Sequence, residues 1–415
     1  MFFFYQFLIF LILIFSPIIF FIRILKNKED KKRFLEKLCL NRIRKSSGEL
    51  IWFHAASVGE LMSIIPLIYE LEKNSSIKMI LVTTSTLSSS KIFNKFKFKK
   101  TIHQFYPIDF YIINLKFLNY WKPSVAIFVE SEIWPSMFRL LNRKSIKLLL
   151  LNARITKKSF KKWSKFKSFS KDIFSNINVA YPQNLETKDY LKQLNVKNIK
   201  KIGNLKFTET EKNKKNTNVS LKLRNNFKKR IVLCASSTHA KEEILIGNVH
   251  KKLKNKFKNL ITVIIPRHIE RTSQIEREIK QMGLKSIIRS SNKKIENDTD
   301  VYLVDTYGET KKFFQLSNIC FMGGSFINHG GQNPIEPARF GINIIHGPYI
   351  NNFRDIYDLF NKNKIAFKIN NAKELITLSE KLLIKKNKKK FDLNNIGKKI
   401  LKKTLKEISY EFIKT

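Results

Sequence analysis

Short apolar runs alternate with longer amphipathic stretches along most of the chain. Apolar runs of this length that end in polar or glycine-containing turns are typical of buried strands, and the amphipathic stretches between them are typical of helices. The expected strands lie at 50–55, 79–84, 125–129, 148–151, 179–181, 231–235, 260–265, 301–304, 319–322 and 343–346. Strands that alternate with helices favour parallel α/β layers over a β-sandwich or a helical bundle.

One polar, charged segment breaks this alternation at 209–230. It has no strand pattern, so we interpret it as a linker between two domains. The 415 residues are enough for two hydrophobic cores. We therefore expect an N-terminal α/β domain over 34–208, a C-terminal α/β domain over 231–395 and a helical tail over 396–415.

The first 22 residues carry no charge. As a helix they would extend about 33 Å, which exceeds the roughly 30 Å hydrocarbon core of a bilayer. A cleaved signal peptide needs a basic start, a shorter apolar core and small residues at the cleavage site, and this segment has none of them. Basic residues follow between Arg23 and Arg33, which by the positive-inside rule keeps the remaining chain in the cytoplasm. We expect a single-pass membrane anchor over 1–24.

A formal net charge of +46 is typical of proteins that bind nucleic acid or membranes, but here it is weak evidence for either partner. The basic residues are spread over nearly the whole length, as a biased nucleotide composition produces, so we expect no nucleic-acid partner. Part of the charge can face an anionic lipid surface, where each nearby Lys or Arg contributes about 1 kcal/mol. Two basic and aromatic segments, 91–121 and 157–171, fit either a nucleic-acid stacking platform or an interfacial membrane surface, and an adjacent anchor favours the membrane. The alternative is that several of these aromatic side chains belong to the core.

Cysteine and histidine spacings predict neither a disulfide framework nor a metal site. Cys39, Cys234 and Cys320 lie far apart and include no C-x-x-C pair, which indicates a reducing compartment. The seven histidines lack metal-ligand spacing, so we expect no structural metal.

Glycine is concentrated in one region of this glycine-poor chain. Seven of its thirteen glycines lie between Gly308 and Gly347. Glycine is required where the backbone adopts positive φ or approaches a ligand closely. The apolar run 318–322 also ends directly on Gly323, and a strand that runs into a glycine turn is typical of the ligand-binding edge of an open α/β sheet. We expect a binding site here.

A short helix is expected behind this loop. Asn333 suits an N-cap, Pro334 the first helical position, Glu336 the first turn and Gly341 the end of the helix. The free N–H groups and the macrodipole of a helix N-terminus attract anions. The alternative is a tight loop with a capped short helix and no ligand, because isolated glycine pairs are weak signals.

Glu60 allows two interpretations. Ser57 and Glu60 follow the strand at 50–55 with the spacing of a capping box, in which Ser57 is the N-cap. Alternatively, Glu60 is a general base that faces the binding site. A helix N-terminus favours the ionised carboxylate, which could then accept a proton at neutral pH.

A resemblance to a known family adds to these patterns. The turn His54-Ala55-Ala56-Ser57-Val58-Gly59-Glu60 resembles the start of the bacterial 3-deoxy-D-manno-octulosonic acid (Kdo) transferases, which build the inner core of lipopolysaccharide. Further segments resemble the family in the same order: Glu130-Ser131-Glu132-Ile133-Trp134-Pro135, Asn152-Ala153-Arg154, Gly203-Asn204-Leu205-Lys206-Phe207, Ser236-Ser237-Thr238-His239, Pro266-Arg267-His268, Asp305-Thr306-Tyr307-Gly308-Glu309 and Gly323-Gly324-Ser325 to Glu336. Ordered motifs are far more specific than any single one of them. The chain departs from the family at two positions: Ser131 replaces the family's Thr, and Thr310 replaces a residue that is commonly Leu.

The resemblance implies a GT-B glycosyltransferase with two Rossmann-like domains that face each other across a cleft. The C-terminal domain would hold the donor CMP-Kdo, and the N-terminal domain the acceptor, an anionic lipid A precursor (lipid IVA). The family requires no metal or other cofactor. Its members attach to the cytoplasmic face of the inner membrane, which agrees with the expected N-terminal anchor.

The same resemblance implies roles for individual residues. Glu60 matches the base that deprotonates the acceptor hydroxyl for attack, with inversion, on the anomeric carbon of Kdo. Glu130 and Lys206 match positions assigned to transition-state stabilisation. The CMP-binding segments are matched by Pro266, Arg267, Gly308, Glu309, Thr310, Asn333, Pro334, Ile335 and Glu336.

Physical chemistry offers a functional and a structural interpretation for most of these side chains. Arg267 can form a bidentate pair with phosphate or a weak surface salt bridge. Glu336 can accept from both ribose hydroxyls or merely complement its helix dipole. Lys206 can offset negative charge on the donor or leaving group, and Glu130 can orient Lys206 or a substrate hydroxyl.

The histidines of these motifs are also ambiguous. His54, His239 and His268 can donate hydrogen bonds at the donor site, although a satisfied structural histidine is the default.

Two other functions fit parts of the sequence. One is a GT-B transferase that uses a UDP-sugar on another membrane lipid. The other, from a different class, is a non-catalytic basic protein that binds a membrane or nucleic acid through a decayed transferase fold. The intact set Glu60, Arg267 and Glu336 argues against the second.

Overall fold

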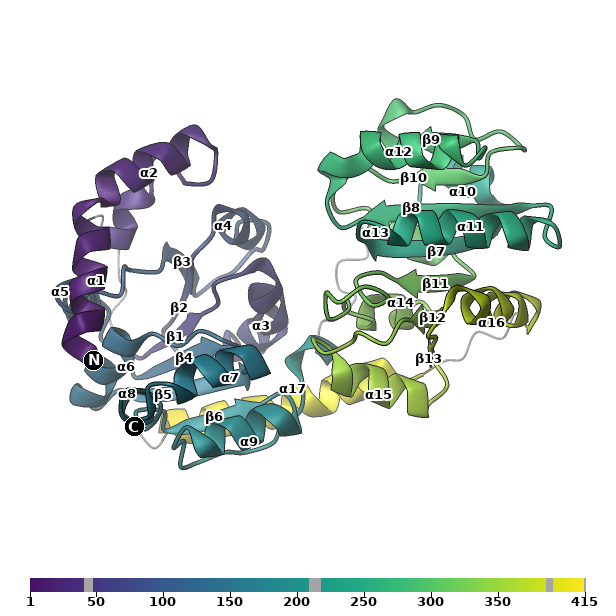
Figure 1. Cartoon of the computed structure of the whole chain (residues 1–415). Helices are drawn as coiled ribbons and strands as arrows, with labels where there is room; N and C mark the ends of the chain where they lie inside the picture. The colour runs from purple at the N-terminus through teal and green to yellow at the C-terminus, as the bar shows by residue number, and fades with distance from the viewer. Residues whose placement is uncertain (41–47, 209–217, 386–390, 414–415) are drawn as a thin grey trace. The chain divides into compact units, whose positions relative to one another are not determined.

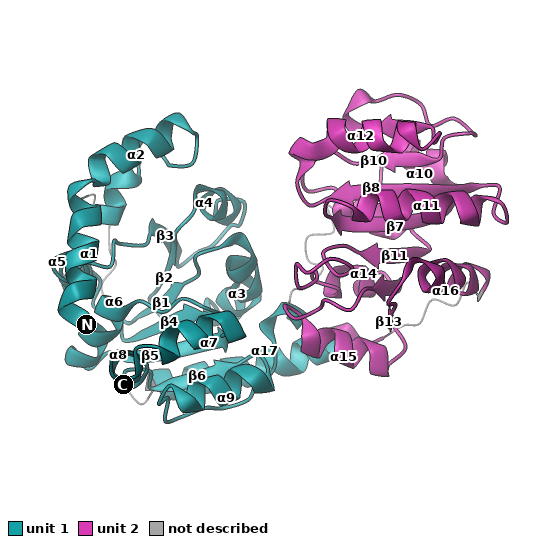
Figure 2. Cartoon of the chain, viewed as in Figure 1, with its two compact units in different colours: residues 1–210, 394–415 teal, residues 211–393 magenta. Residues whose placement is uncertain are grey.

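The chain forms two compact units, each built around a parallel β-sheet with flanking helices (Figures 1 and 2). The computed structural model describes residues 1–40, 48–208, 218–385 and 391–413. Unit 1 comprises Met1–Thr210 and Asn394–Thr415, and unit 2 comprises Glu211–Leu393.

The sheet of unit 1 has six parallel strands in the order β3-β2-β1-β4-β5-β6. Its strands are β1 (Leu50–His54), β2 (Met79–Thr84), β3 (Thr101–Phe105), β4 (Val125–Val129), β5 (Lys147–Ala153) and β6 (Val179–Pro182). This is the Rossmann order, in which the winding reverses between β1 and β4 and ligands bind outside the carboxyl ends of the strands at that point. Glu130 lies in the loop after β4, and Glu60 lies in the first turn of the helix that follows β1.

The helices of unit 1 connect these strands. They are α1 (Phe2–Ile14), α2 (Ser16–Leu25), α3 (Val58–Leu71), α4 (Leu87–Phe93), α5 (Tyr111–Trp121), α6 (Pro135–Arg143), α7 (Lys157–Ser164), α8 (Lys167–Phe174), α9 (Leu185–Gln193) and the C-terminal α17 (Leu393–Ile413). All five residues of β1 are buried, because helices cover both faces of a parallel sheet.

The sheet of unit 2 has seven parallel strands in the order β13-β12-β11-β7-β8-β10-β9. They are β7 (Ile231–Thr238), β8 (Leu260–Pro266), β9 (Ser286–Ile288), β10 (Val301–Leu303), β11 (Ile319–Met322), β12 (Asn343–His346) and β13 (Ala366–Lys368). The winding reverses between β7 and β11. The loop after β11 contains Gly323, Gly324, Gly330 and Gly331, and we call it the glycine loop. It leaves the sheet at the position where such folds bind ligands.

The helices of unit 2 are α10 (Leu221–Phe227), α11 (Glu242–Lys254), α12 (Thr272–Gln281), α13 (Thr310–Leu316), α14 (Ile335–Arg339), α15 (Arg354–Lys362) and α16 (Ala372–Lys385). Helix α11 packs between the sheet and α16, and its inward side chains Ile246, Val249 and Leu253 are fully buried.

The expected linker contains a helix, and the expected helical tail is a helix that packs on unit 1. Residues 209–217 of the linker lie outside the described residues. Its later part forms α10, where Phe227 packs edge-on against Tyr302 and lies near Phe313. The tail is α17, which belongs to unit 1: Glu407 pairs with Lys200 at 2.7 Å and accepts a hydrogen bond from Tyr181.

The expected N-terminal span is not one helix. Helices α1 and α2 meet at an angle of 56°. Pro17 lies in the first turn of α2, where it lacks the N–H that a continuous helix would donate to Leu13, and its ring crowds that carbonyl. In the described part of the chain, no single helix is long and apolar enough to cross a membrane. The bent pair of α1 and α2 meets the requirement for a membrane span by length and composition only.

The basic and aromatic segments are partly core. In 91–121, Phe93, Phe105, Tyr106 and Phe117 are buried, so that stretch supplies α4, β3 and α5 to the fold. In 157–171, Phe166 is half exposed.

Candidate functional site

Glu60 lies in the first turn of α3, at the carboxyl end of β1. The side chain of Ser57 caps the helix by accepting from the Glu60 N–H at 3.3 Å. In return, the Glu60 carboxylate accepts from the Ala56 N–H at 2.7 Å and the Ser57 hydroxyl at 2.9 Å. The capping-box interpretation therefore describes the local structure, and these two donors fix the carboxylate next to the end of β1.

The charge state of Glu60 differs from the sequence-based expectation. Burial, followed by the carboxylates of Glu132 and Glu130, raises the pKa of Glu60 to about 7, against the opposing hydrogen bonds from Ser57 and Ala56. The expectation considered the helix N-terminus alone. Burial and two like charges outweigh it, so at neutral pH the carboxyl is close to half protonated, the range in which a carboxyl exchanges protons readily.

Glu130 and Lys206 form a buried ion pair of 2.7 Å in unit 1. Glu130 follows β4 in the left-handed region, with a φ of 57°. Asn152, at the end of β5, also has positive φ; its amide donates to Glu130 Oε1 at 3.4 Å, and its Oδ1 accepts from the Leu205 N–H at 3.1 Å. Backbone strain of this kind costs of order 1–3 kcal/mol for each residue and gathers at functional sites.

Glu132 is a site residue that sequence reasoning did not select. Its Oε2 lies 3.2 Å from His54 Nε2 and accepts from Trp134 Nε1 at 2.9 Å. The ring of His54 is fully buried, and its Nδ1 lies 3.0 Å from Thr83 Oγ1. Of the two interpretations of His54, the structure supports the satisfied structural one. The Glu-x-Glu spacing of 130 and 132 was the available signal for Glu132.

In unit 2, the glycine loop packs directly against the end of β7. A Cβ on Gly323 would lie 2.4 Å from the Ser237 carbonyl oxygen, so only glycine fits. Glu242, a fully buried carboxylate that the sequence did not reveal, accepts from the backbone N–H groups of His239, Gly324 and Phe326 at 2.8–3.1 Å. These three bonds hold the loop against the end of β7.

The expected donor residues lie on three loops of unit 2. Pro266 ends β8, and the Arg267 N–H donates to the Thr238 carbonyl at 2.9 Å, while the Arg267 side chain is exposed. Gly308 has a φ of 80°, and Glu309 and Thr310 lie at the start of α13.

Glu309 already has cationic partners. Its carboxylate contacts Arg289 at 3.1 Å and Lys312 at 2.9 Å. Burial raises the pKa of Glu309, but hydrogen bonds outweigh this and lower it to about 2; they come from Thr306, Lys312 and Arg289. The Glu309 side chain thus stabilises its loop.

The helix after the glycine loop is α14, shorter and one residue later than expected. Pro334 is the N-cap rather than the first helical residue, Ile335 starts the helix and the helix ends at Arg339. The Asn333 side chain still accepts from the Ile335 N–H at 3.1 Å. Glu336 Oε1 lies 3.7 Å from Lys311 Nζ of α13. Five residues give a small macrodipole, so anion binding here would depend mainly on side chains.

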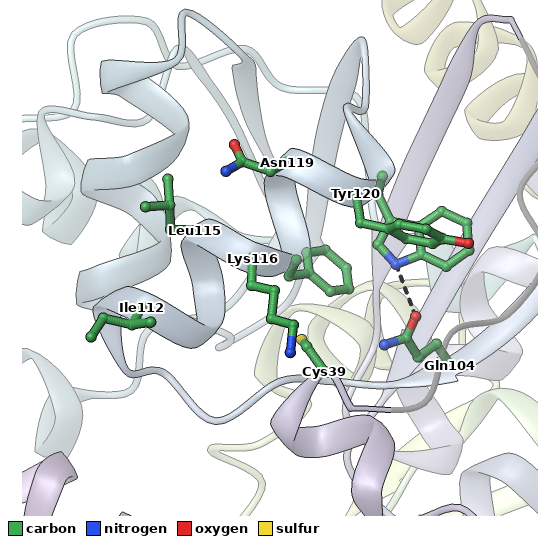
Figure 3. Close-up of a pocket in the computed structure, with 9 residues that line it drawn as sticks. Cys39, Gln104, Ile112, Leu115, Lys116, Asn119 and Tyr120 are labelled. Atoms are coloured by element: carbon green, nitrogen blue, oxygen red, sulfur yellow. Dashed lines mark hydrogen bonds between the residues drawn. The ribbon is translucent and has the colours of Figure 1, made fainter.

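A cavity of about 490 Å³ in unit 1 does not coincide with these residues. It lies beside α5, with Cys39, Gln104 and Lys116 in its wall (Figure 3). None of the expected site residues lines it. The site assignment therefore rests on the strand ends and the polar contacts there.

Fold and site together define a class. Two parallel α/β units, with polar loops at the switch point of each sheet and a glycine-rich one in unit 2, form the GT-B fold. A glycosyltransferase from Rickettsia africae has the same fold, with a TM-score of 0.56 at 13% identity over 88% of this chain and 95% of that one. At this identity the likeness concerns the fold alone.

Sequence comparison assigns the family. The model of the 3-deoxy-D-manno-octulosonic-acid transferase family matches residues 31–209. A 3-deoxy-D-manno-octulosonic acid transferase of Rickettsia bellii is 36% identical over 96% of this chain and 94% of its own length. That of Haemophilus influenzae is 29% identical over 85% and 83%. The chain belongs to the Kdo transferase family and is a glycosyltransferase, as the ordered motifs predicted.

Proposed function

We propose that the chain transfers Kdo from CMP-Kdo to lipid IVA at the cytoplasmic face of the inner membrane, with inversion and with Glu60 as the general base. The observation that carries the proposal is the environment of Glu60. Its carboxyl is fixed at the switch point of unit 1, and its pKa is raised to about 7 by burial and by its two neighbouring glutamates. That value suits a group that must take a proton at physiological pH.

In the proposed step, a Glu60 carboxylate oxygen takes the proton of the acceptor hydroxyl while the hydroxyl oxygen attacks the anomeric carbon of Kdo. The bond between this carbon and the phosphate oxygen breaks, and CMP leaves with the electron pair. Glu60 then releases its proton to solvent. Lys206, held by Glu130 at 2.7 Å, supplies positive charge that offsets the developing negative charge.

The donor half of the proposal lies in unit 2. Arg267 has no salt-bridge partner among the described residues and follows β8, the neighbour of β7, so its guanidinium is available for the donor phosphate. Backbone groups at Gly308, Thr310 and Asn333 and the Glu336 carboxylate would bind the remaining parts of CMP. Because Glu309 is paired with two cations, we assign it to the support of its loop rather than to direct contact.

The membrane part of the proposal rests on α1 and α2. Phe3 is 88%, Phe7 54% and Phe21 63% exposed, an apolar surface that soluble proteins rarely leave uncovered. Helix α1 is tied to unit 1 by a 2.7 Å hydrogen bond from Tyr5 to Asp109. We propose that these two helices attach the enzyme to the inner membrane and that the basic residues after them face anionic lipid.

The test is Glu60→Gln, with Glu70→Gln on the exposed part of α3 as the matched control. Transfer to lipid IVA, followed by product mass analysis, should fall at least about 100-fold in kcat for Glu60→Gln and remain unchanged for Glu70→Gln. A folded Glu60→Gln enzyme with near wild-type turnover would refute the base assignment. Stabilisation of the wild type by UDP and not by CMP in a thermal shift would refute the donor.

A further inference from the structure

The seven histidines of the chain fall into two groups. Each ring nitrogen of the first group lies within hydrogen-bond distance of a partner; these histidines are His54, His103, His250 and His346. They are the satisfied structural type. The second group is His239, His268 and His329. Among the described residues, the only hydrogen-bond contact of its rings is a 3.4 Å approach of Gln332 Nε2 to His239 Nε2.

The three rings of the second group come together at the switch point of unit 2. His239 follows β7, His268 follows β8 and His329 lies in the loop after β11. The His239 and His329 rings stack with centroids 4.3 Å apart and planes 15° apart, and the His268 ring lies edge-on, 5.9 Å from His239. We call these three residues the histidine cluster.

The surroundings of the cluster are cationic. The Arg267 and Arg271 side chains both lower the pKa of His239. The acidic groups nearby are already engaged: Glu242 accepts the three loop N–H groups, and buried Glu243 pairs with Arg271 at 2.9 Å. Neighbouring guanidinium groups oppose a metal cation and favour an anion.

Within the cluster, the His239 ring is neutral at physiological pH. Burial, and then the nearby His329, His268, Arg267 and Arg271, lower the pKa of His239 to about 4. An anion placed among these rings has the opposite effect, because it favours the imidazolium form. Binding of the anion and uptake of a proton are therefore linked.

We propose that His239, His268 and His329, together with Arg267, bind an anionic oxygen group of the donor, its phosphate or its sugar carboxylate, with uptake of one proton from solvent. The inference rests on the proposed donor, CMP-Kdo, which carries both groups. The cluster would take up a proton and offset the negative charge of the donor when the donor binds. It would release the proton when the product leaves.

Calorimetric titration of CMP into the full chain tests this inference. The variants are His329→Gln and His268→Gln, both at exposed positions, and the matched control is Arg277→Gln, an exposed cation on α12. Each titration is run at pH 6.5 in two buffers of different ionisation enthalpy, which gives the number of protons taken up. The phosphate of CMP itself titrates near pH 6, so the difference between wild type and variant isolates the contribution of the cluster.

If the cluster binds phosphate, each histidine variant should weaken CMP binding about tenfold and lower the proton uptake, whereas Arg277→Gln should change neither. Cytidine, which lacks the phosphate, should bind wild type and variants equally. If the cluster binds the carboxylate, CMP binding should be unchanged but the KM for CMP-Kdo should rise about tenfold in the same variants.

Unchanged CMP binding together with an unchanged KM for CMP-Kdo would overturn the inference and leave the proposed function intact. A wild type that binds no CMP would instead overturn the proposed donor. In that case inorganic phosphate serves as the probe, and equal phosphate binding by wild type and His329→Gln would overturn the cluster as well.

Discussion

At the residue scale, the candidate catalytic centre is a group of carboxylates whose charges are balanced unequally. Glu130 pairs with Lys206 at 2.7 Å, whereas Glu132 contacts the Trp134 Nε1 at 2.9 Å and the His54 Nε2 at 3.2 Å. After burial, Glu132 and then Glu130 raise the pKa of Glu60.

Glu132→Gln should shift the pH dependence of the enzyme. A glutamine amide oxygen can still accept from Trp134 and His54, but the negative charge is gone. The pKa of Glu60 should then fall below about 7. Since the base acts as the carboxylate, activity rises as pH rises through this pKa, and the rising limb of kcat/KM should move to lower pH. An unmoved limb in the variant would show that Glu132 has no electrostatic effect on Glu60; Glu70→Gln is the control.

At the element scale, short-range contacts between strand ends and glycine turns position both half-sites. In unit 1, the ends of β4 and β5 carry Glu130 and Asn152 in the left-handed region. In unit 2, the end of β7 fits against Gly323 with no room for a side chain. Such contacts fix the loops because the parallel strands beneath them are buried and cannot shift independently.

Gly323→Ala should disrupt the donor half-site. The added Cβ would lie 2.4 Å from the Ser237 oxygen and 2.6 Å from the Thr238 Cα, and these backbone atoms cannot move without displacing β7. We expect a lower thermal midpoint for unfolding and at least a tenfold weaker CMP affinity by calorimetry. Gly59→Ala, whose Cβ meets nothing within 4 Å, should leave stability unchanged or raise it slightly. A Gly323→Ala protein with wild-type melting and CMP affinity would contradict the tight packing.

Replacing Phe3, Phe7 and Phe21 together by Ser should release the chain from membranes. These exposed side chains are the proposed contact with lipid, and each buried phenyl contributes about 1.5–3 kcal/mol to partitioning. Flotation with vesicles that contain anionic lipid should recover the wild type and not the triple variant. Leu221→Ser, which removes a 76% exposed leucine from α10 in unit 2, is the control. Equal flotation of the triple variant and wild type would exclude these helices as the attachment.

At the scale of the whole molecule, the proposed reaction divides between two units with separate cores. The base and the Glu130–Lys206 pair belong to unit 1, and the expected donor residues belong to unit 2. The proposed step assigns every role to protein side chains and substrate groups, and the absence of a metal or other cofactor requirement stays a prediction.

Removal of metal should therefore leave the enzyme active. After dialysis against EDTA, the initial rate of Kdo transfer should equal that of the untreated enzyme within error, because Lys206 and Arg267 supply the positive charge that a metal provides in other transferases. A loss of activity that Mg²⁺ restores would contradict this expectation. Heat-inactivated enzyme in the same assay corrects for donor hydrolysis.

The sequence by itself determined the interior strands and the family. Strands such as β1 and β4 are buried on both faces, so their residues are continuously apolar and visible without a structure. The strands it missed, β3, β9 and β13, all lie at sheet edges, where fewer neighbours demand apolar side chains. The ordered motifs sufficed for Kdo transferase membership because their residues are dictated by chemistry and turn geometry.

Only the tertiary structure brought together side chains that are distant in the chain. Glu132 contacts His54, and Glu242 accepts hydrogen bonds from Gly324 and Phe326. His329 stacks on His239. The tertiary structure also raised the pKa of Glu60 above the value expected from the sequence, because burial and nearby carboxylates outweigh the local helix terminus. Periodicity and motifs predict the local structure of each segment. The pKa values and side-chain clusters depend instead on which segments the fold places in contact.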